Sequence, residues 1–189
     1  MHQERTATIL VVDDDQEVVD AYALRLRQRY DEVRTAYGGR EALETVDDTV
    51  DVVLLDRRMP YSGDKVLKEI RERGHDCRVI MVTAVDPDFG IVDMPFDDYL
   101  TKPVTREDLL GAVDEMLSRE SYDDQMQEYF AAVSKKATLE SEKNPAELDE
   151  SDEYAEINQR VDELSEQADQ SAAEVDDVEA LFHDLPGEE

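Results

Sequence analysis

The segment from Val50 to Asp56 reads Val-Asp-Val-Val-Leu-Leu-Asp, an apolar run that ends at an aspartate. The run is short and rich in β-branched residues, and a turn containing Pro60 and Gly63 follows it. These features predict a strand that is buried on both faces, at the centre of a parallel sheet. In open α/β sheets, ligands bind at the carboxyl ends of the strands. Asp56 lies at that end and is therefore the first candidate for a reactive group.

The order of the remaining segments predicts an α/β fold. Strands are expected at 8–12, 32–37, 78–83 and 98–101. Amphipathic helices are expected at 16–29, 40–46, 63–73 and 105–117, where apolar side chains recur every three or four residues. Strands that alternate with helices pair in parallel through right-handed crossovers. The prediction is a doubly wound five-stranded parallel sheet, followed by an all-α helical arm.

The interval between residues 83 and 98 is the exception to this alternation. Pro87, Gly90 and Pro95 stand where a further crossover helix would lie. Proline inside a helix costs about 3 kcal/mol, because it removes a backbone donor and clashes with the preceding turn. We therefore expect only a turn or two of helix in this interval.

Five polar residues stand at the predicted strand ends. Asp13 and Asp14 follow the first strand and Asp56 the central one, so three carboxylates would share a small volume. Carboxylates this close need a cation, and hard oxygen ligands favour Mg²⁺. Thr83 ends the fourth strand and Lys102 follows the fifth, and together they suit a phosphoryl group carried on an aspartate. Taken singly, such an aspartate is more often a turn residue and such a threonine more often a cap.

Composition limits the class of protein. The 189 residues carry a formal net charge of −30, which argues against a nucleic-acid surface, although less so in concentrated salt. Six of the 20 basic residues are lysine, and this acidic, lysine-poor composition resembles that of proteins from halophilic archaea; a plain acidic protein is the alternative. The single Cys77 is expected in the core, and His2, His75 and His183 in solvent. Without a signal peptide or membrane span, we expect a soluble, cytoplasmic protein.

The C-terminal region is predicted to be helical. No Gly, Pro or Ser linker follows residue 117, so one helix is expected to continue from 105–117 through about Lys143. Its apolar stripe comprises Met126, Tyr129, Phe130, Val133 and Ala137. Asn144-Pro145 breaks it, and the next apolar positions have coiled-coil spacing: Tyr154, Ile157, Val161, Leu164, Ala168, Ser171, Val175, Val178, Phe182 and Leu185. Two helices joined by a short break favour an antiparallel hairpin.

Four stretches together resemble the receiver domain of two-component response regulators. They are Ile9 to Asp15, Asp56-Arg57-Arg58-Met59-Pro60 with Gly63, Thr83-Ala84, and Tyr99-Leu100-Thr101-Lys102-Pro103. The resemblance covers residues 7–118 and implies a flavodoxin-like fold, with residues 1–118 as the receiver domain. It also implies that Asp56 accepts a phosphoryl group from a histidine kinase, and that the protein is a regulator and not an enzyme.

The same resemblance implies a metal site around Asp56. Asp14 and Asp56 would ligate Mg²⁺ together with the backbone carbonyl of Arg58. Asp13 would hold the outer shell of the metal. A phosphohydrolase with Asp56 as nucleophile is an alternative class, but it would have a second carboxylate two residues later, where this chain has Arg58.

Roles for the remaining strand-end residues also follow from the resemblance. Lys102 would bind the phosphoryl oxygens, and its bond to Pro103 is usually cis in the family. Thr83 would close on the phosphoryl group, and Tyr99 would turn inward as the switch aromatic. The interval from Thr83 to Lys102 is about one helical turn shorter than is usual in the family, which leaves the route of signalling open.

Residues 119–189 resemble the HalX domain that follows receivers in halophilic archaea, and the match rests on Tyr122 to Lys143. The leading hypothesis is a phosphorylation switch that controls the packing or dimerisation of this helical arm, in transcriptional or signalling control. The alternative is a transcription factor that binds DNA directly through the arm. A homodimer, formed through the arm or through the receiver face, is also left open.

Overall fold

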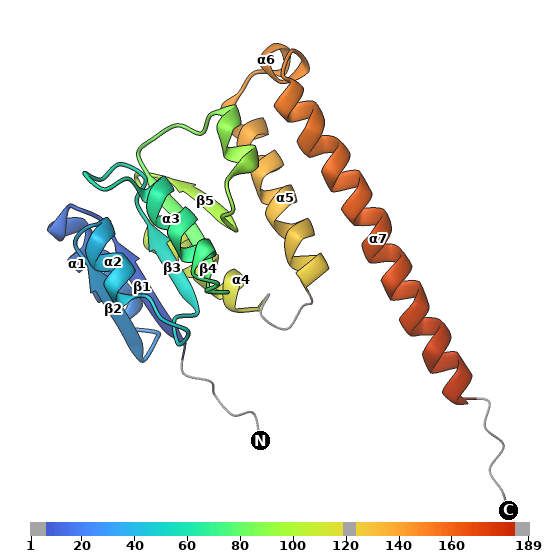
Figure 1. The fold of residues 1–189 in the computed structure, drawn as a ribbon, viewed down its shortest axis with the longest axis horizontal. Coiled ribbons are helices and arrows are strands. Elements are labelled where there is room, and N and C mark those ends of the chain that lie inside the picture. Colours follow the sequence, from blue (N-terminus) through green and yellow to red (C-terminus); the bar gives the residue numbers. More distant parts are fainter. Residues whose placement is uncertain (1–6, 119–123, 184–189) are drawn as a thin grey trace, which may run out of the picture.

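The computed structural model describes residues 7–118 and 124–183, with the side chains in these ranges apart from those of 124–125 and 168–183. Five parallel strands form one sheet in the order β2-β1-β3-β4-β5 (Figure 1). The strands are β1 (Thr8–Val12), β2 (Glu32–Ala36), β3 (Val52–Leu55), β4 (Arg78–Thr83) and β5 (Asp98–Thr101). The helices around them are α1 (Gln16–Leu26), α2 (Gly39–Thr45), α3 (Gly63–Glu72) and α4 (Arg106–Ser118). The predicted doubly wound sheet is confirmed.

The central strand β3 is buried on both faces, as its apolar run predicted. Val53 and Leu55 face one core, and Val52 and Leu54 face the other. The two sets alternate because successive side chains of a strand point to opposite faces of the sheet. β3 pairs with β1 on one side and with β4 on the other. Asp56 therefore follows a strand that is enclosed in every direction.

Helices cover both faces of the sheet. On one face α1 and α4 bury side chains such as Leu26 and Leu109. On the other face α2 and α3 bury side chains such as Leu43 and Ile70. Each large apolar side chain that is fully buried stabilises the fold by roughly 1.5–3 kcal/mol relative to its exposure. These two cores hold the strand ends, and the residues that follow them, in fixed positions.

Local signals set the ends of these helices. Asp15 and Ser62 begin α1 and α3, because their side chains accept hydrogen bonds from backbone amides of the first turn. Gly74, with φ of 78°, ends α3, since glycine adopts this left-handed conformation without steric cost. Thr105 begins α4, as predicted, and its Oγ1 accepts a hydrogen bond of 3.1 Å from the amide of Asp108.

The crossover from β4 to β5 contains the five-residue 3-10 helix η1 (Phe89–Asp93). This confirms the expectation of only a turn or two of helix in the interval that contains Pro87, Gly90 and Pro95. Ile91 of η1 is fully buried in the same core as α2 and α3. A helix this short covers less of the sheet than a full crossover helix does.

The C-terminal region forms the predicted helical hairpin (Figure 1). α5 (Asp124–Glu142) and α7 (Asp152–His183) lie side by side and antiparallel, and α6 (Pro145–Asp149) joins them. Asn144 begins α6 with a capping box that Glu147 completes. The predicted break at Asn144-Pro145 is therefore confirmed, since proline is favoured at the first position of a new helix.

The seam of the hairpin follows part of the predicted heptad pattern. Ile157 and Leu164 of α7 are buried with Ala132 of α5, and Tyr154 and Val161 pack against this cluster. Burial of this cluster holds α5 and α7 together. The later predicted positions, from Ala168 onward, lie outside the described side chains.

The prediction of one continuous helix from the receiver into the arm is wrong. α4 packs through Leu109 and Val113 on one face of the sheet, whereas α5 packs through Leu139 on the opposite face. Two helices on opposite faces cannot form one straight rod. The periodicity shows that both segments are amphipathic, but it does not show which face each one covers. Residues 119–123, which connect the two helices, lie outside the described residues.

The predicted apolar stripe of α5 is corrected in part, since Tyr129 packs against the hairpin cluster as predicted. The helix buries Ala132 and Leu139, whereas Val133 and Ala137 are exposed. The reason is that α5 has two neighbours, α7 on one side and the receiver on the other. The apolar pattern predicts a helix with one buried side, whereas this helix buries two.

Of the predicted solvated histidines, His75 is partly buried, and its Nδ1 lies 2.8 Å from Oδ1 of Asp48. This expectation was wrong because the loop after α3 folds back toward Asp48. The side chains of His2 and His183 lie outside the described residues. Cys77 lies in the core, as expected.

Candidate functional site

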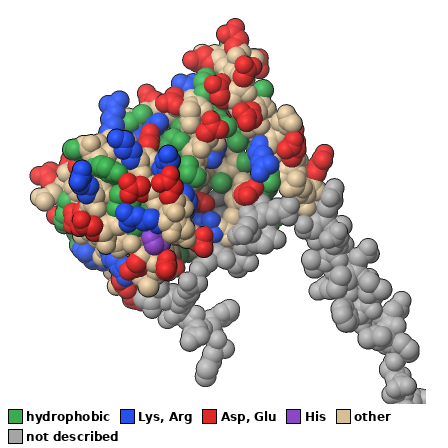
Figure 2. Space-filling model, in the orientation of Figure 1, with side chains coloured by type: hydrophobic (Ala, Val, Ile, Leu, Met, Phe, Trp, Pro, Cys, Tyr) green, Lys and Arg blue, Asp and Glu red, His purple; other side chains and the backbone are tan. Residues whose placement is uncertain are grey.

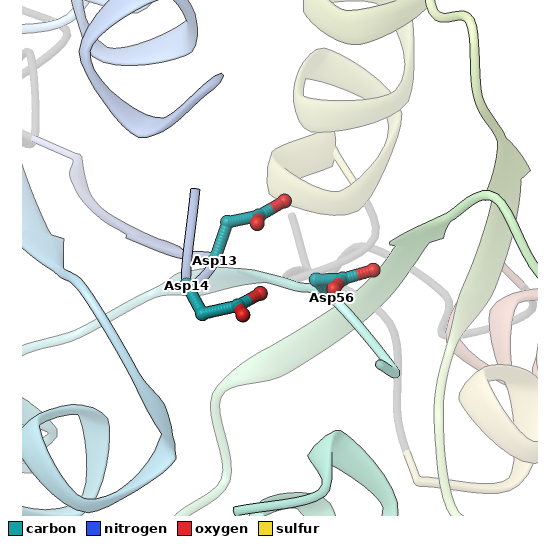
Figure 3. Close-up of side chains that lie close together, drawn as sticks. All are labelled: Asp13, Asp14 and Asp56. Carbon is teal, nitrogen blue, oxygen red and sulfur yellow. The ribbon is translucent and has the colours of Figure 1, made fainter. Parts of the chain in front are cut away.

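The carboxyl ends of β1 and β3 bring three aspartates together (Figure 3). Asp13 and Asp14 follow β1, Asp56 follows β3, and carboxylate oxygens of all three lie within 4.8 Å of one another. Asp13 and Asp56 are 4% and 5% exposed, whereas Asp14 is exposed. The structure thus brings together the three acidic residues predicted from the sequence, in a cluster with one side in solvent.

Lys102 brings a positive charge to this cluster from the end of β5. Its Nζ lies 2.5 Å from Oδ2 of Asp13 and 3.7 Å from Oδ1 of Asp56. Burial lowers the pKa of Lys102, but the hydrogen bond to Asp13 and the charge of Asp56 outweigh burial and raise the pKa. The ammonium group is therefore charged at neutral pH. Its peptide bond to Pro103 is cis, as the family resemblance implied.

Burial raises the pKa of Asp56 above its ordinary value. The charge of Lys102 lowers this pKa, the charge of Asp13 raises it, and hydrogen bonds from the Thr83 hydroxyl and the Arg58 backbone lower it. One ammonium group cannot neutralise three carboxylates. Three hard oxygen donors with an excess of two negative charges fit a divalent cation such as Mg²⁺.

The side chains of Thr83 and Tyr99 both form a hydrogen bond with the backbone of Val85. Thr83 is fully buried at the end of β4, and its Oγ1 accepts a hydrogen bond of 3.3 Å from the amide of Val85. The hydroxyl of Tyr99 donates a hydrogen bond of 2.7 Å to the carbonyl of Val85. The ring of Tyr99 is buried, as expected, and packs against Phe96. A movement of Thr83 would therefore act on the same backbone segment that holds Tyr99.

The loop after Asp56 contains a residue that the sequence analysis missed. Nε of Arg57 donates to Oδ1 of Asp64 at 3.0 Å, and its Nη1 lies 3.7 Å from Oδ2 of Asp88. Arg57 thus links this loop to the start of η1. Because this contact depends on how the crossover folds, no pattern of residue spacing in the sequence indicates it. Gly63 closes the loop, since a Cβ there would overlap the carbonyl oxygen of Asp56.

Asp15 and Arg58 lie a few residues beyond the ends of β1 and β3. Asp15 lies outside the cluster of three aspartates: it caps α1, and its amide donates to Oδ1 of Asp13 at 2.9 Å. The backbone of Arg58 lies next to the Asp56 carboxylate through its amide. The role of the Arg58 carbonyl as a metal ligand stays a prediction.

The chain matches two protein families along its length. Residues 9–114 match the response regulator receiver domain, which is more than half of the chain. The protein belongs to the response regulator receiver family. Residues 118–182 match the HalX domain, so the protein is a receiver followed by a HalX domain, as the sequence predicted.

Curated relatives support this assignment. A Haloferax volcanii protein, provisionally named a transcriptional regulator, is 50% identical over 155 residues, which are 82% of this chain and 26% of that protein. Transcriptional regulatory protein CpxR of Escherichia coli is 36% identical over 124 residues, which cover 63% of this chain and 53% of CpxR. The chain thus spans between about a quarter and a half of the length of these relatives.

Solved structures share the receiver fold. The BeF3-activated receiver domain of DrrB is 32% identical, with a TM-score of 0.56, and covers 61% of this chain and 100% of its own. Response regulator TrrA from Thermotoga maritima, in complex with Mg²⁺ and BeF, is 31% identical with a TM-score of 0.51 and covers 58% of this chain and 98% of its own. These similarities confirm the predicted fold class.

Proposed function

We propose that this protein is a response regulator in which Asp56 accepts a phosphoryl group from a histidine kinase. The observation that carries the proposal is the position of Asp56, buried at the end of the central strand between Asp13 and Lys102. In the transfer, an oxygen of Asp56 attacks phosphorus. The P–N bond of the phosphohistidine breaks, and the imidazole nitrogen retains the electron pair and takes up a proton.

The residues around Asp56 stabilise the transferred group. The Nζ of Lys102, 3.7 Å from Oδ1 of Asp56, would pair with a phosphoryl oxygen, and the hydroxyl of Thr83 would donate to another. Asp13, Asp14 and Asp56, with the carbonyl of Arg58, would hold Mg²⁺. The metal supplies positive charge against the phosphoryl oxygens.

Beryllofluoride, which mimics a phosphoryl group on aspartate, tests this proposal. With Mg²⁺ and wild-type protein, fluorine NMR is expected to show a bound resonance. Asp56→Asn is expected to lose that resonance, because the anionic oxygen that completes the beryllium complex is gone. Asp86→Asn, which changes an exposed aspartate of the β4–β5 crossover, is the matched control and keeps the signal. A bound resonance in Asp56→Asn equal to that of wild type would contradict the assignment.

The output of the switch is proposed to be transcriptional control. The support is that the relatives from Haloferax volcanii and Escherichia coli carry transcription-regulator names. Acidic side chains crowd the end of the hairpin around α6 (Figure 2), which disfavours direct contact between that end and DNA. A mobility shift of promoter DNA that persists in concentrated salt would favour the DNA-binding alternative.

A cytoplasmic location is part of the same proposal, because histidine kinases transfer their phosphoryl group to cytoplasmic receivers. Within the described ranges, no helix has the length and apolarity needed to cross a bilayer. Self-association through the arm or the receiver face is tested by light scattering with and without beryllofluoride. An increase in mass would support a phosphorylation-dependent homodimer.

A further inference from the structure

The β4–β5 crossover leaves part of the sheet without a helix of its own, and α5 covers that part. Leu139 of α5 is 0% exposed and belongs to the same apolar core as Met81 of β4 and Tyr99 of β5. Leu148 of α6 is buried in this core as well, and Tyr154 of α7 packs against it. The hairpin therefore shares its interior with the receiver. α5 lies between β5 and α7, while the C-terminal part of α7 extends beyond the receiver (Figure 1).

Polar contacts fix the position of α5 on the receiver. The hydroxyl of Ser134 donates a hydrogen bond of 2.7 Å to Oδ1 of Asp98, at the start of β5. The Nζ of Lys135 donates to the carbonyl of Val92 in η1 at 3.2 Å and lies 5.2 Å from the centre of the Phe96 ring. These contacts join α5 to β5 and to η1, which border the part of the sheet that the crossover leaves without a helix.

We propose that α5 completes the receiver fold, in place of a crossover helix, and that the hairpin senses the state of Asp56 through β5. The route consists of contacts that the structure contains. Thr83 and Tyr99 share the backbone of Val85, as described above. Asp98 directly precedes Tyr99 in β5, and its carboxylate accepts the hydrogen bond from Ser134 of α5. This coupling rests on the proposed function of Asp56.

A hairpin that completes the receiver differs from an output domain that folds independently of the receiver. The two family matches divide the chain between residues 114 and 118, whereas the apolar core extends from the sheet into Leu139 and Leu148. The expected domain boundary between residues 118 and 119 would thus separate two family matches along the sequence. It would not separate two segments that fold independently. An independent hairpin would unfold without effect on β4 and β5.

The docking step is tested by hydrogen exchange on the full chain in concentrated salt. Leu139→Ala removes a fully buried side chain, so amides of β4 and β5 are expected to exchange about 30-fold faster than in wild type. Val133→Ala, on an exposed position of the same helix, is the matched control and should change exchange by less than about threefold. Faster exchange in Leu139→Ala that is confined to residues 124–183 would overturn the docking step.

The coupling step is tested with Ser134→Ala, with Ser141→Ala on the exposed side of α5 as control. Fluorine NMR first establishes that beryllofluoride binds to each protein. In wild type and Ser141→Ala, bound beryllofluoride is expected to change exchange of residues 131–142 at least threefold, and in Ser134→Ala this change should be lost. Bound beryllofluoride with unchanged exchange in wild type would overturn the coupling alone. No bound signal would overturn the proposed function, and the coupling with it, while the Leu139→Ala result still decides docking.

Discussion

The residues of the candidate site are held in position by the strands that they follow. Asp13 and Asp56 are buried after two adjacent strands, and Lys102 reaches both from a strand at the edge of the sheet. Asp14 is the exposed member of the cluster and has no lysine partner among the contacts described. Its carboxylate is therefore the one most available to a metal.

Replacement of Asp14 by alanine is expected to weaken Mg²⁺ binding at least about tenfold, because it removes one of the few charged ligands. Isothermal titration of Mg²⁺ into Asp14→Ala and wild type measures the change. Asp20→Ala, an exposed aspartate on α1, is the control and should bind like wild type. Equal affinities for Asp14→Ala and wild type would remove Asp14 from the metal site.

Lys135 provides a pH-dependent test of the docked hairpin. Burial lowers its pKa below the ordinary value of 10.5, although Asp97 and Asp93 oppose this. The unfolded chain therefore binds the proton more tightly, so stability rises as pH increases toward 10.5. Denaturant midpoints of wild type should rise relative to those of Lys135→Met between neutral pH and about pH 10. With Lys136→Met as reference, parallel curves for all three proteins would show that Lys135 is not buried.

At the scale of elements, local signals predicted most of the fold. The apolar run of β3, Thr105 at the start of α4 and the prolines before β5 each act within a few residues, so the sequence shows them directly. The course of the chain after Ser118 depends on contacts between distant segments. Leu139 is one apolar residue in an amphipathic helix, and nothing nearby in sequence shows that it joins the same apolar core as Met81.

The short helix α6 holds the turn of the hairpin, and its cap can be tested alone. Asn144→Ala removes the side-chain acceptor for the amides of Ala146 and Glu147 and is expected to cost about 1 kcal/mol. Equilibrium unfolding in denaturant measures this loss. Gln159→Ala, on the exposed side of α7, serves as the reference. An unchanged midpoint for Asn144→Ala would mean that the cap does not contribute to the folded hairpin.

For the molecule as a whole, the candidate site was more predictable than the arrangement of its parts. Asp13, Asp14, Asp56, Thr83 and Lys102 were found because topology alone brings the ends of parallel strands to one edge. Contacts such as Arg57 with Asp88 were missed, since they require the folded crossover. The packing of the hairpin beside β5 was not predicted either, because it depends on how much of the sheet η1 leaves uncovered in the folded protein.

The phosphorylated residue can be located after phosphorylation with acetyl phosphate and Mg²⁺. Borohydride reduces an acyl phosphate to an alcohol, so a phosphorylated aspartate becomes homoserine, which mass spectrometry of peptides can place in the sequence. Homoserine is expected at position 56, only with Mg²⁺ present, and none is expected in Asp56→Asn. Homoserine at position 13 or 14 in the wild-type chain, with Asp56 unmodified, would contradict this expectation.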